Sequence, residues 1–164
     1  MGDDGEAELS PQRSRISRRR DGTYRVELPS EERDLLRALP RQLRSLLEEQ
    51  PTEPTLRRLF PPAYPVDPAH EKEYQELVGD DLRSGHAAAL ELLEQTADAT
   101  ELDEEQLLSW MRALNQLRLV IGTRLDVDDD TSGRLPDPTE PDAHVRSVFL
   151  YLGWLQEQVV DALS

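Results

Sequence analysis

The stretch LDEEQLLSWMRALNQLRLVIGTRLDV, residues 102–127, is the longest run of this chain with a clean helical period. Its large apolar side chains recur at intervals of three and four residues, which places them on one face of a helix. These side chains are Leu107, Trp110, Met111, Leu114, Leu117 and Ile121. Asp103 and Gln106 have the form of a capping box at the start of the helix, and Gly122 marks its end. We predict that the rest of the chain packs around this helix.

Arg118 lies within the apolar face of the central helix, and Gln156 interrupts the apolar face of the last helix. A charged side chain that is buried alone is strongly unfavourable, so the guanidinium must bind an anion, pair with a polar group or stay in water. If the two helices are antiparallel neighbours, Arg118 and Gln156 share a buried polar network. That network either fixes the register of the helices or lines a pocket for a small anion or a partner's carboxylate. The candidate partner-binding or anion-binding residues are Asn115, Arg118, Arg124, Asp126, Trp154, Gln156 and Glu157.

The chain has 164 residues and a formal net charge of -15. The strong negative charge disfavours nucleic acid binding by the body as a whole, because it repels phosphate. There is no cysteine, which excludes a disulfide or a zinc–thiolate site. Without an apolar run for a membrane span or a signal peptide, we expect a cytoplasmic protein with no membrane contact. We predict a disordered acidic tail over residues 1–12 and one domain over residues 13–164.

A β-hairpin is predicted near the N-terminus. Asp21-Gly22 is a strong hairpin signal, and Tyr24, Val26 and Leu28 alternate with polar residues, which predicts a strand with one apolar face. Helices must cover that face, because an isolated hairpin is only marginally stable. The arginines of the hairpin are candidate DNA contacts, although a charged edge that prevents strand addition is the favoured interpretation. These arginines are Arg15, Arg18, Arg19 and Arg20.

Proline and glycine predict the boundaries of the other helices. Pro40 is expected to kink or break a leucine-rich helix over residues 30–49. Gly79 is expected to end a helix that starts at Pro68, and a further helix follows it. The last helix is expected to begin at Pro141. Because it is apolar on two sides, it either runs through the middle of the bundle or presents Trp154 to a protein partner or a second copy in a homodimer.

The sequence contains no motif for catalysis or cofactor binding. Four aspartates between residues 126 and 137 match positions of a calcium loop, but Thr131 stands where glycine is required, so a solvated acidic loop is favoured. His86 lies on an apolar helix face, where a hydrogen-bonded core histidine is favoured over a proton-transfer group. We therefore expect no enzymatic activity, no cofactor and no metal. An enzyme with a pocket around Arg118 stays as an alternative.

Three separated blocks resemble one known protein family. They are LFPPAY at residues 59–64, LRLVIGTRLDV at 117–127 and YLGWLQE at 151–157. In this order they resemble an actinobacterial family of oxidative-stress regulators of the AosR type, formerly a domain of unknown function. The resemblance covers residues 13–163. It implies a role in transcription together with a stress sigma factor and RNA polymerase, with cysteine-biosynthesis genes among the targets.

The redox switch attributed to this family uses a pair of cysteines, and this chain has none, so a disulfide sensor is excluded here. Family genes tend to lie beside those for the proteolytic adaptor ClpS, a Mov34-type metallopeptidase and a sulfur-carrier protein, which implies an adaptor role as the alternative. We predict a mainly α fold, a helical bundle with an N-terminal β-hairpin packed against it. The predicted function is regulation by contact with a sigma factor or RNA polymerase, in stress response or cysteine-biosynthesis control.

Overall fold

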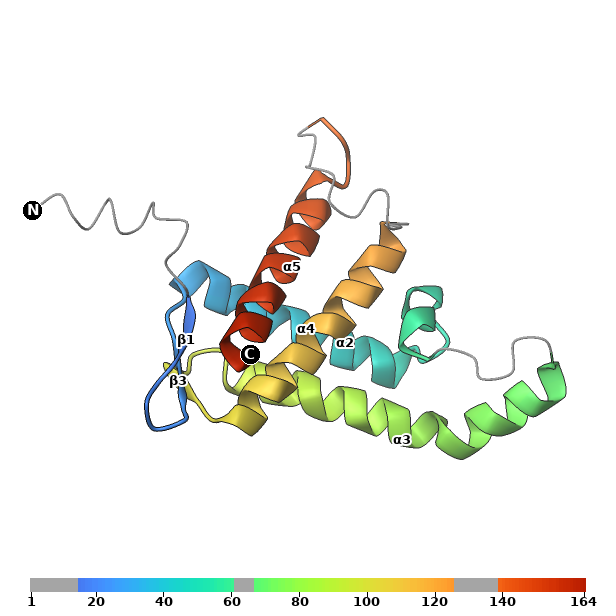
Figure 1. Ribbon diagram of the computed structural model, residues 1–164. Coiled ribbons are helices and arrows are strands. Elements are labelled where there is room, and N and C mark those ends of the chain that lie inside the picture. The colour runs from blue at the N-terminus through green and yellow to red at the C-terminus, as the bar shows by residue number, and fades with distance from the viewer. Residues whose placement is uncertain (1–14, 61–66, 126–138) are drawn as a thin grey trace, which may run out of the picture.

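The computed structural model describes residues 15–60, 67–125 and 139–164. The predicted tail over residues 1–12 and the candidate residue Asp126 lie outside this part of the chain, as do the aspartates of the acidic loop up to residue 137. The elements, in chain order, are β1 (Ile16–Arg18), β2 (Tyr24–Val26), α2 (Ser30–Glu49), the 3-10 helix η1 (Pro54–Leu59), α3 (Pro68–Gln95), β3 (Glu101–Leu102), α4 (Glu104–Arg124) and α5 (Ala143–Leu163). The predicted fold class, a helical bundle with an N-terminal hairpin packed against it, is confirmed (Figure 1).

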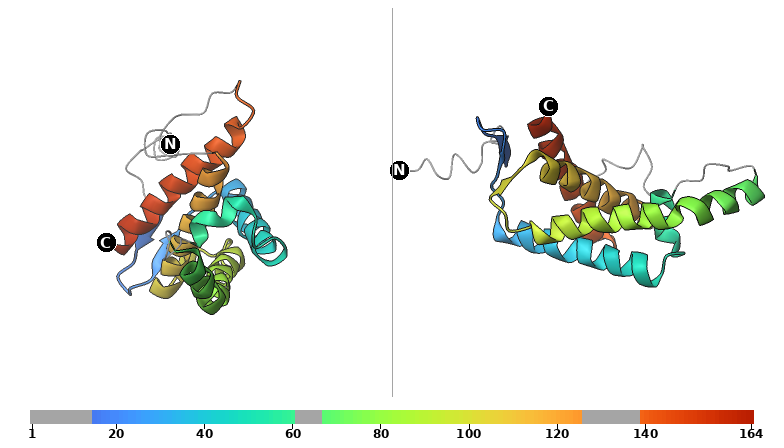
Figure 2. Two further views of the ribbon diagram at one scale, coloured as in Figure 1. Left: turned by 90° about the vertical axis from the view of Figure 1, so that its right-hand side faces the viewer. Right: turned by 90° about the horizontal axis from the view of Figure 1, so that it is seen from below.

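The central position predicted for α4 is also found. It contacts α2, α3, α5 and η1, whereas α2 and α3 also pack against each other. Figure 2 shows α2 and α3 side by side, with α4 and α5 on one side of them. The two helices α4 and α5 run antiparallel, so residues far apart in the sequence meet between them (Figure 1).

The hairpin turns at Gly22, whose φ of +90° is a backbone conformation that glycine adopts without strain. β1 and β2 are antiparallel, with Ile16 opposite Val26. Ile16, Tyr24 and Val26 are buried on the face that packs on the helices. β3 adds a third antiparallel strand, with Tyr24 opposite Leu102. This strand was not predicted from the sequence, because two residues carry no detectable alternation.

Two predicted helix breaks are wrong. α2 continues through Pro40, and α3 continues through Gly79. Proline removes one helical hydrogen bond and glycine lowers helix propensity by about 1 kcal/mol, but neither forbids the helical conformation. Both residues are buried. Pro40 lies on the buried face of α2, and Gly79 lines a pocket with residues of the 51–60 segment, among them Leu56 and Phe60. Tertiary contacts of this kind commonly override the local helix preference.

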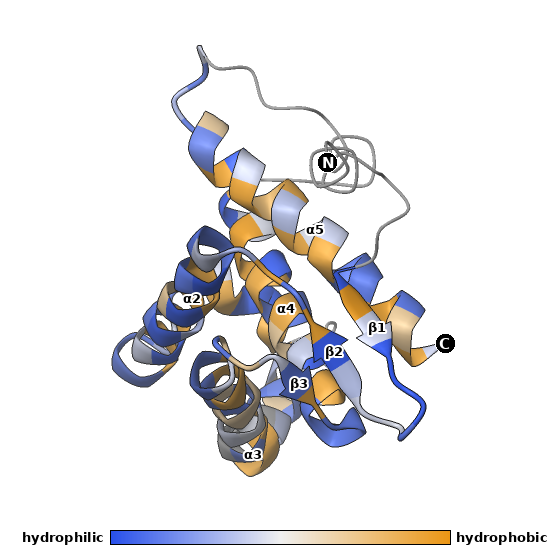
Figure 3. Cartoon of the chain, turned by 90° about the vertical axis from the view of Figure 1, so that its left-hand side faces the viewer, coloured by the Kyte–Doolittle hydropathy of each residue, from blue (hydrophilic) through white to orange (hydrophobic). Residues whose placement is uncertain are grey.

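The capping box at the start of α4 is confirmed. The Asp103 carboxylate accepts from the backbone of Gln106, and the Gln106 side chain accepts from the backbone of Asp103. Trp110 and Leu114 are fully buried at the centre of the core. Hydrophilic residues of α2 lie on the side away from α4, which leaves an apolar interior between them (Figure 3). This core fixes the position of α4 relative to its neighbours.

The last helix begins at Ala143, two residues later than predicted. Phe149, Leu152, Leu155 and Val159 form its buried face. Trp154 lies on the other side and is 37% exposed. Among the helices that the structure describes, none has the length and apolar character to cross a bilayer.

Candidate functional site

The predicted contact between Arg118 and Gln156 is present at the interface of α4 and α5. Arg118 Nη1 donates to Gln156 Oε1 at 2.8 Å, and both side chains are half-buried. The Arg118 guanidinium carbon also lies 5.2 Å from the centre of the Phe149 ring, close enough for a cation–π contact. Arg118 Nε is buried without a hydrogen-bond partner. The guanidinium thus has a polar partner on one edge and an aromatic face beside it.

Gly153 provides the space for this guanidinium. A Cβ atom at position 153 would lie 3.3 Å from both Nε and Nη2 of Arg118. That separation is shorter than ordinary van der Waals contact, so a side chain there requires the guanidinium to shift. The glycine of the block YLGWLQE therefore lies directly against the arginine of the block LRLVIGTRLDV.

A surface pocket of about 230 Å³ opens beside this contact. Its lining includes Arg118, Gln156 and Glu157, three of the predicted site residues, together with Asp161 and Val160. The two carboxylates reduce the attraction of the pocket for a small anion. The mixture of cation, amide and carboxylates suits a polar protein surface better than an isolated anion.

The other predicted residues lie elsewhere. Asn115 is exposed and does not line the pocket beside Arg118. Arg124 lies six residues beyond Arg118, at the end of α4, and lines a different cavity. Of the predicted set, Arg118, Gln156 and Glu157 therefore share one pocket, whereas Asn115 and Arg124 lie away from it.

Trp154 forms the centre of a second cluster. The guanidinium carbon of Arg15 lies 5.5 Å from the centre of the indole ring. The centre of the Tyr151 ring, one turn earlier on α5, lies 5.9 Å from the centre of the indole ring. Arg15 and the Tyr151 hydroxyl both donate to Glu32 of α2, at 3.0 and 2.8 Å. Burial of the ring, reinforced by the Glu32 carboxylate, raises the pKa of Tyr151. Trp154 is therefore packed on one side and open to solvent on the other.

Some of the hairpin arginines form ion pairs within the protein, and others are exposed to solvent. Arg15 pairs with Glu32, and Arg19 Nη1 lies 3.4 Å from Glu101. Arg18 and Arg20 are exposed. β1 is at the edge of the sheet, the position in which a charged strand prevents pairing with another chain. Two of the four candidate DNA contacts are thus engaged in intramolecular ion pairs.

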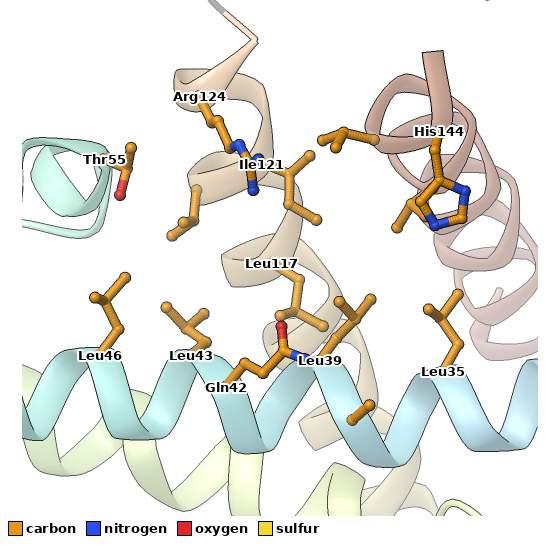
Figure 4. A pocket seen from close by; sticks show the side chains of 14 residues that line it. Leu35, Leu39, Gln42, Leu43, Leu46, Thr55, Leu117, Ile121, Arg124 and His144 are labelled. Atoms are coloured by element: carbon orange, nitrogen blue, oxygen red, sulfur yellow. The ribbon is translucent and has the colours of Figure 1, made fainter. Parts of the chain in front are cut away.

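A larger cavity, of about 420 Å³, was not predicted from the sequence. It lies between α2, η1, α4 and α5, and Figure 4 shows leucines of α2 below it and Arg124 reaching down toward it from α4. Its aliphatic lining comprises Leu35, Ala38, Leu39, Leu43, Leu46, Leu117, Val120, Ile121, Val145 and Val148, and its polar lining comprises Gln42, Thr55, Arg124 and His144. Such a cavity depends on how four elements pack, and no local sequence pattern indicates it.

His86 has a structural explanation. His86 Nε2 lies 2.9 Å from the carbonyl oxygen of Leu59, and its ring packs edge-on against Phe60. His86 is therefore hydrogen-bonded, as favoured from the sequence, but it is half-buried at the edge of the core. Among the described residues, no group of three or more histidine, aspartate or glutamate side chains is arranged to hold a metal ion.

Comparison with known proteins identifies the family. The model of a domain of unknown function, DUF2017, matches residues 13–163. The chain belongs to the DUF2017 family. This DUF2017 chain is 33% identical over 129 residues to the oxidative stress regulator AosR of Mycobacterium tuberculosis strain H37Rv, a match that covers 68% of the chain and 59% of the relative. No solved structure matches it.

Two further relatives carry the same name. The oxidative stress regulator AosR of Mycobacterium bovis is also 33% identical over 129 residues. A Mycobacterium leprae protein, to which the AosR name is attached provisionally, is 32% identical over 136 residues, which covers 70% of this DUF2017 chain and 60% of the relative. The chain thus spans about 60% of the length of these relatives. The family resemblance expected from the three sequence blocks is confirmed.

Proposed function

We propose that this DUF2017 protein is a non-enzymatic regulator in an oxidative stress response and that it acts by binding a sigma factor or RNA polymerase. The name of the mycobacterial relatives supports the regulatory role. The observation that supports a protein contact is the outer face of α5, where Trp154 and Val160 are 37% and 44% exposed. Partly exposed aromatic and aliphatic side chains on one helix are typical of protein-binding surfaces.

The charge around this face favours a basic partner. Glu157 is exposed next to Trp154 and Val160, and Asp161 is exposed one turn later. The whole chain has a formal net charge of -15. Such a field accelerates association with a positively charged protein surface and slows association with an acidic one. A basic surface of a transcription protein is therefore the partner chemistry that we propose.

The absence of cysteine from this sequence constrains how the stress signal arrives. A disulfide switch needs two thiols, so oxidation cannot act on this chain in that way. In our proposal the signal reaches the regulator through its partner or through a bound ligand. Regulation then consists of a change in the affinity of the complex.

The test measures binding of the purified protein to purified RNA polymerase and to the purified sigma factors of its source organism. The variant Trp154→Ala/Val160→Ala removes the exposed apolar side chains of α5. Leu77→Ala, at a residue of α3 that is 74% exposed, is the matched control. We expect the double variant to weaken binding at least about tenfold, the typical effect of losing an interface hot spot, and the control to bind like the wild type.

Two results would contradict this function. One is the failure of the wild-type protein to bind any of these transcription proteins. The other is selective binding of ClpS or a sulfur-carrier protein, which would establish the adaptor role instead.

A further inference from the structure

The cavity between α2, η1, α4 and α5 has the composition of a ligand site. We propose that it binds a small amphiphilic monocarboxylate, with the aliphatic chain inside the cavity and the carboxylate at Arg124. The proposal is independent of the partner contact on α5, because neither Trp154 nor Val160 lines this cavity.

The walls define the apolar part of the ligand. Ten of the fourteen lining residues are Leu, Ile, Val or Ala, and the volume of about 420 Å³ lies within the range typical of ligand pockets. The view in Figure 4 shows Leu35, Leu39, Leu43 and Leu46 along one side and Ile121 facing them across the opening. An unbranched or branched aliphatic chain would remove these side chains from water, which is favourable.

The polar residues define the other end of the ligand. The Arg124 side chain is exposed, and its guanidinium makes no hydrogen bond or ion pair with another described residue. A guanidinium offers a planar pair of donors that matches a carboxylate. His144, also exposed, lies at the same opening on α5 and offers a further donor or acceptor (Figure 4).

The electrostatic surroundings of Arg124 favour a ligand with one negative charge over a ligand with two. Arg124 is in the last turn of α4, where the helix dipole is negative, and the net charge of the chain is -15. Each additional negative charge on a ligand would be repelled by this field. A carboxylate with one charge is therefore favoured over a phosphate monoester. Arg124 also offsets the helix dipole without any ligand, and the experiment separates that role from ligand binding.

The experiment uses octanoate as the probe and octan-1-ol as its uncharged analogue, with affinities measured by NMR titration on the full chain. Arg124→Gln removes the cation at the opening, and Ala38→Phe places a ring in the cavity from an exposed position of α2. Arg112→Gln, at an exposed residue of the same helix outside the cavity, is the matched control for the loss of one charge.

We expect saturable binding of octanoate to one site, with shifts of the methyl resonances of Val120 and Ile121. Arg124→Gln should weaken octanoate about tenfold, the value of one charge-assisted hydrogen bond, and leave octan-1-ol unchanged. Ala38→Phe should weaken both probes at least tenfold, and Arg112→Gln should bind both like the wild type.

The proposal is overturned if the wild-type protein shows no saturable binding of octanoate, or if the shifted resonances lie away from the cavity. It is also overturned if Arg124→Gln and Arg112→Gln bind octanoate equally, because Arg124 then serves only the helix end. The wild-type titration keeps the test decisive even if Ala38→Phe fails to fold.

Discussion

Arg118 Nη1 and Gln156 Oε1 lie 2.8 Å apart and join two antiparallel helices through residues that each interrupt an apolar face. Gly153 leaves room for the guanidinium, and Phe149 covers one side of it. The two helices bring together the second and third of the sequence blocks that resemble the AosR family. A slip of the two helices by one turn would separate these groups, so we expect the polar pair to favour the observed register of α4 and α5.

A double-mutant cycle tests this pairing. We expect Arg118→Met and Gln156→Leu to destabilise the fold modestly when made singly, with a coupling free energy of about 1 kcal/mol between them, the usual net value of one partly buried hydrogen bond. Urea unfolding of the four proteins measures the coupling. Additive effects of the two substitutions would show that the contact adds nothing to stability.

Arg118→Met also tests a functional role for the same residue. We expect the variant to keep its fold but to lose binding to the transcription partner, because Arg118 lines the pocket next to Val160 on the proposed contact face. Circular dichroism checks the fold, and the binding assay with purified polymerase and sigma factors checks the affinity. Unchanged affinity would restrict Arg118 to its structural contact with Gln156.

Arg33 is expected to be the most important single polar residue for the attachment of the sheet. Its guanidinium donates to four backbone carbonyl oxygens at 2.9 to 3.2 Å, from both β2 and the turn between α3 and β3. The acceptors are the carbonyl groups of Val26, Leu28, Ala97 and Ala99. Arg33→Met would leave these carbonyls without their charged donor, at a cost of about 2–4 kcal/mol.

Denaturant unfolding of Arg33→Met checks this value, with Arg112→Met as the control. Arg112 is exposed, so its replacement should change the free energy of unfolding by less than about 0.5 kcal/mol. Equal stability of the two variants would contradict the role assigned to Arg33. Hydrogen exchange of the backbone amides of Tyr24–Val26 provides an independent measurement. If Arg33→Met loosens the sheet, these amides should exchange faster in the variant than in the wild type.

Local patterns predicted those parts of this structure that depend on neighbouring residues. The capping box of Asp103 and Gln106 follows from their spacing of three residues, and the turn at Gly22 follows from the Asp-Gly pair. The contact of Arg118 with Gln156 was expected on the condition that the two helices are antiparallel neighbours, because each polar residue interrupts an apolar period. Periodicity singled out the two residues, and the packing of α4 against α5 brings them together.

Features that depend on packing between distant elements were missed. A kink or break was expected at Pro40 and a helix end at Gly79, but both residues are buried within continuous helices. The role of Arg33 depends on three segments that meet only in the folded chain. The cavity beside Arg124 is formed by four elements, so the sequence singled out the arginine without indicating the apolar space next to it.

The contact between α2 and α3 should depend on pH through Glu94. Burial alone would raise the pKa of this carboxyl, but hydrogen bonds from Arg41 and Arg44 outweigh burial and hold the pKa below its ordinary value of 4.5. A carboxyl whose pKa is lowered in the folded state stabilises that state above its unfolded pKa, and this stabilisation is lost as the pH falls through the folded pKa. Glu94→Gln should therefore reduce stability at pH 7.

The difference between the wild type and Glu94→Gln should shrink as the pH falls below 4.5, the ordinary value for this group. Thermal unfolding across a pH series measures it. Glu48→Gln removes a carboxylate from an exposed position of α2 and serves as the control. A difference that is constant with pH would mean that the charge of Glu94 does not stabilise the contact, because only a change in protonation produces the predicted slope.

The hydrogen bond between Trp110 and Thr96 is expected to contribute measurably to the free energy of unfolding. Its indole Nε1 donates to Thr96 Oγ1 at 2.7 Å, and the same hydroxyl donates to the carbonyl oxygen of Leu92. Thr96→Val keeps the shape of the side chain but leaves the buried indole N–H unpaired, which should cost about 1–3 kcal/mol. Thr96→Ser retains the hydroxyl and should cost less.

In the Trp110→Phe background the indole donor is absent, so Thr96→Val should have a much smaller effect on the free energy of unfolding, as measured by urea unfolding. An equal cost in both backgrounds would show that the loss arises from packing or from the Leu92 carbonyl, not from the indole.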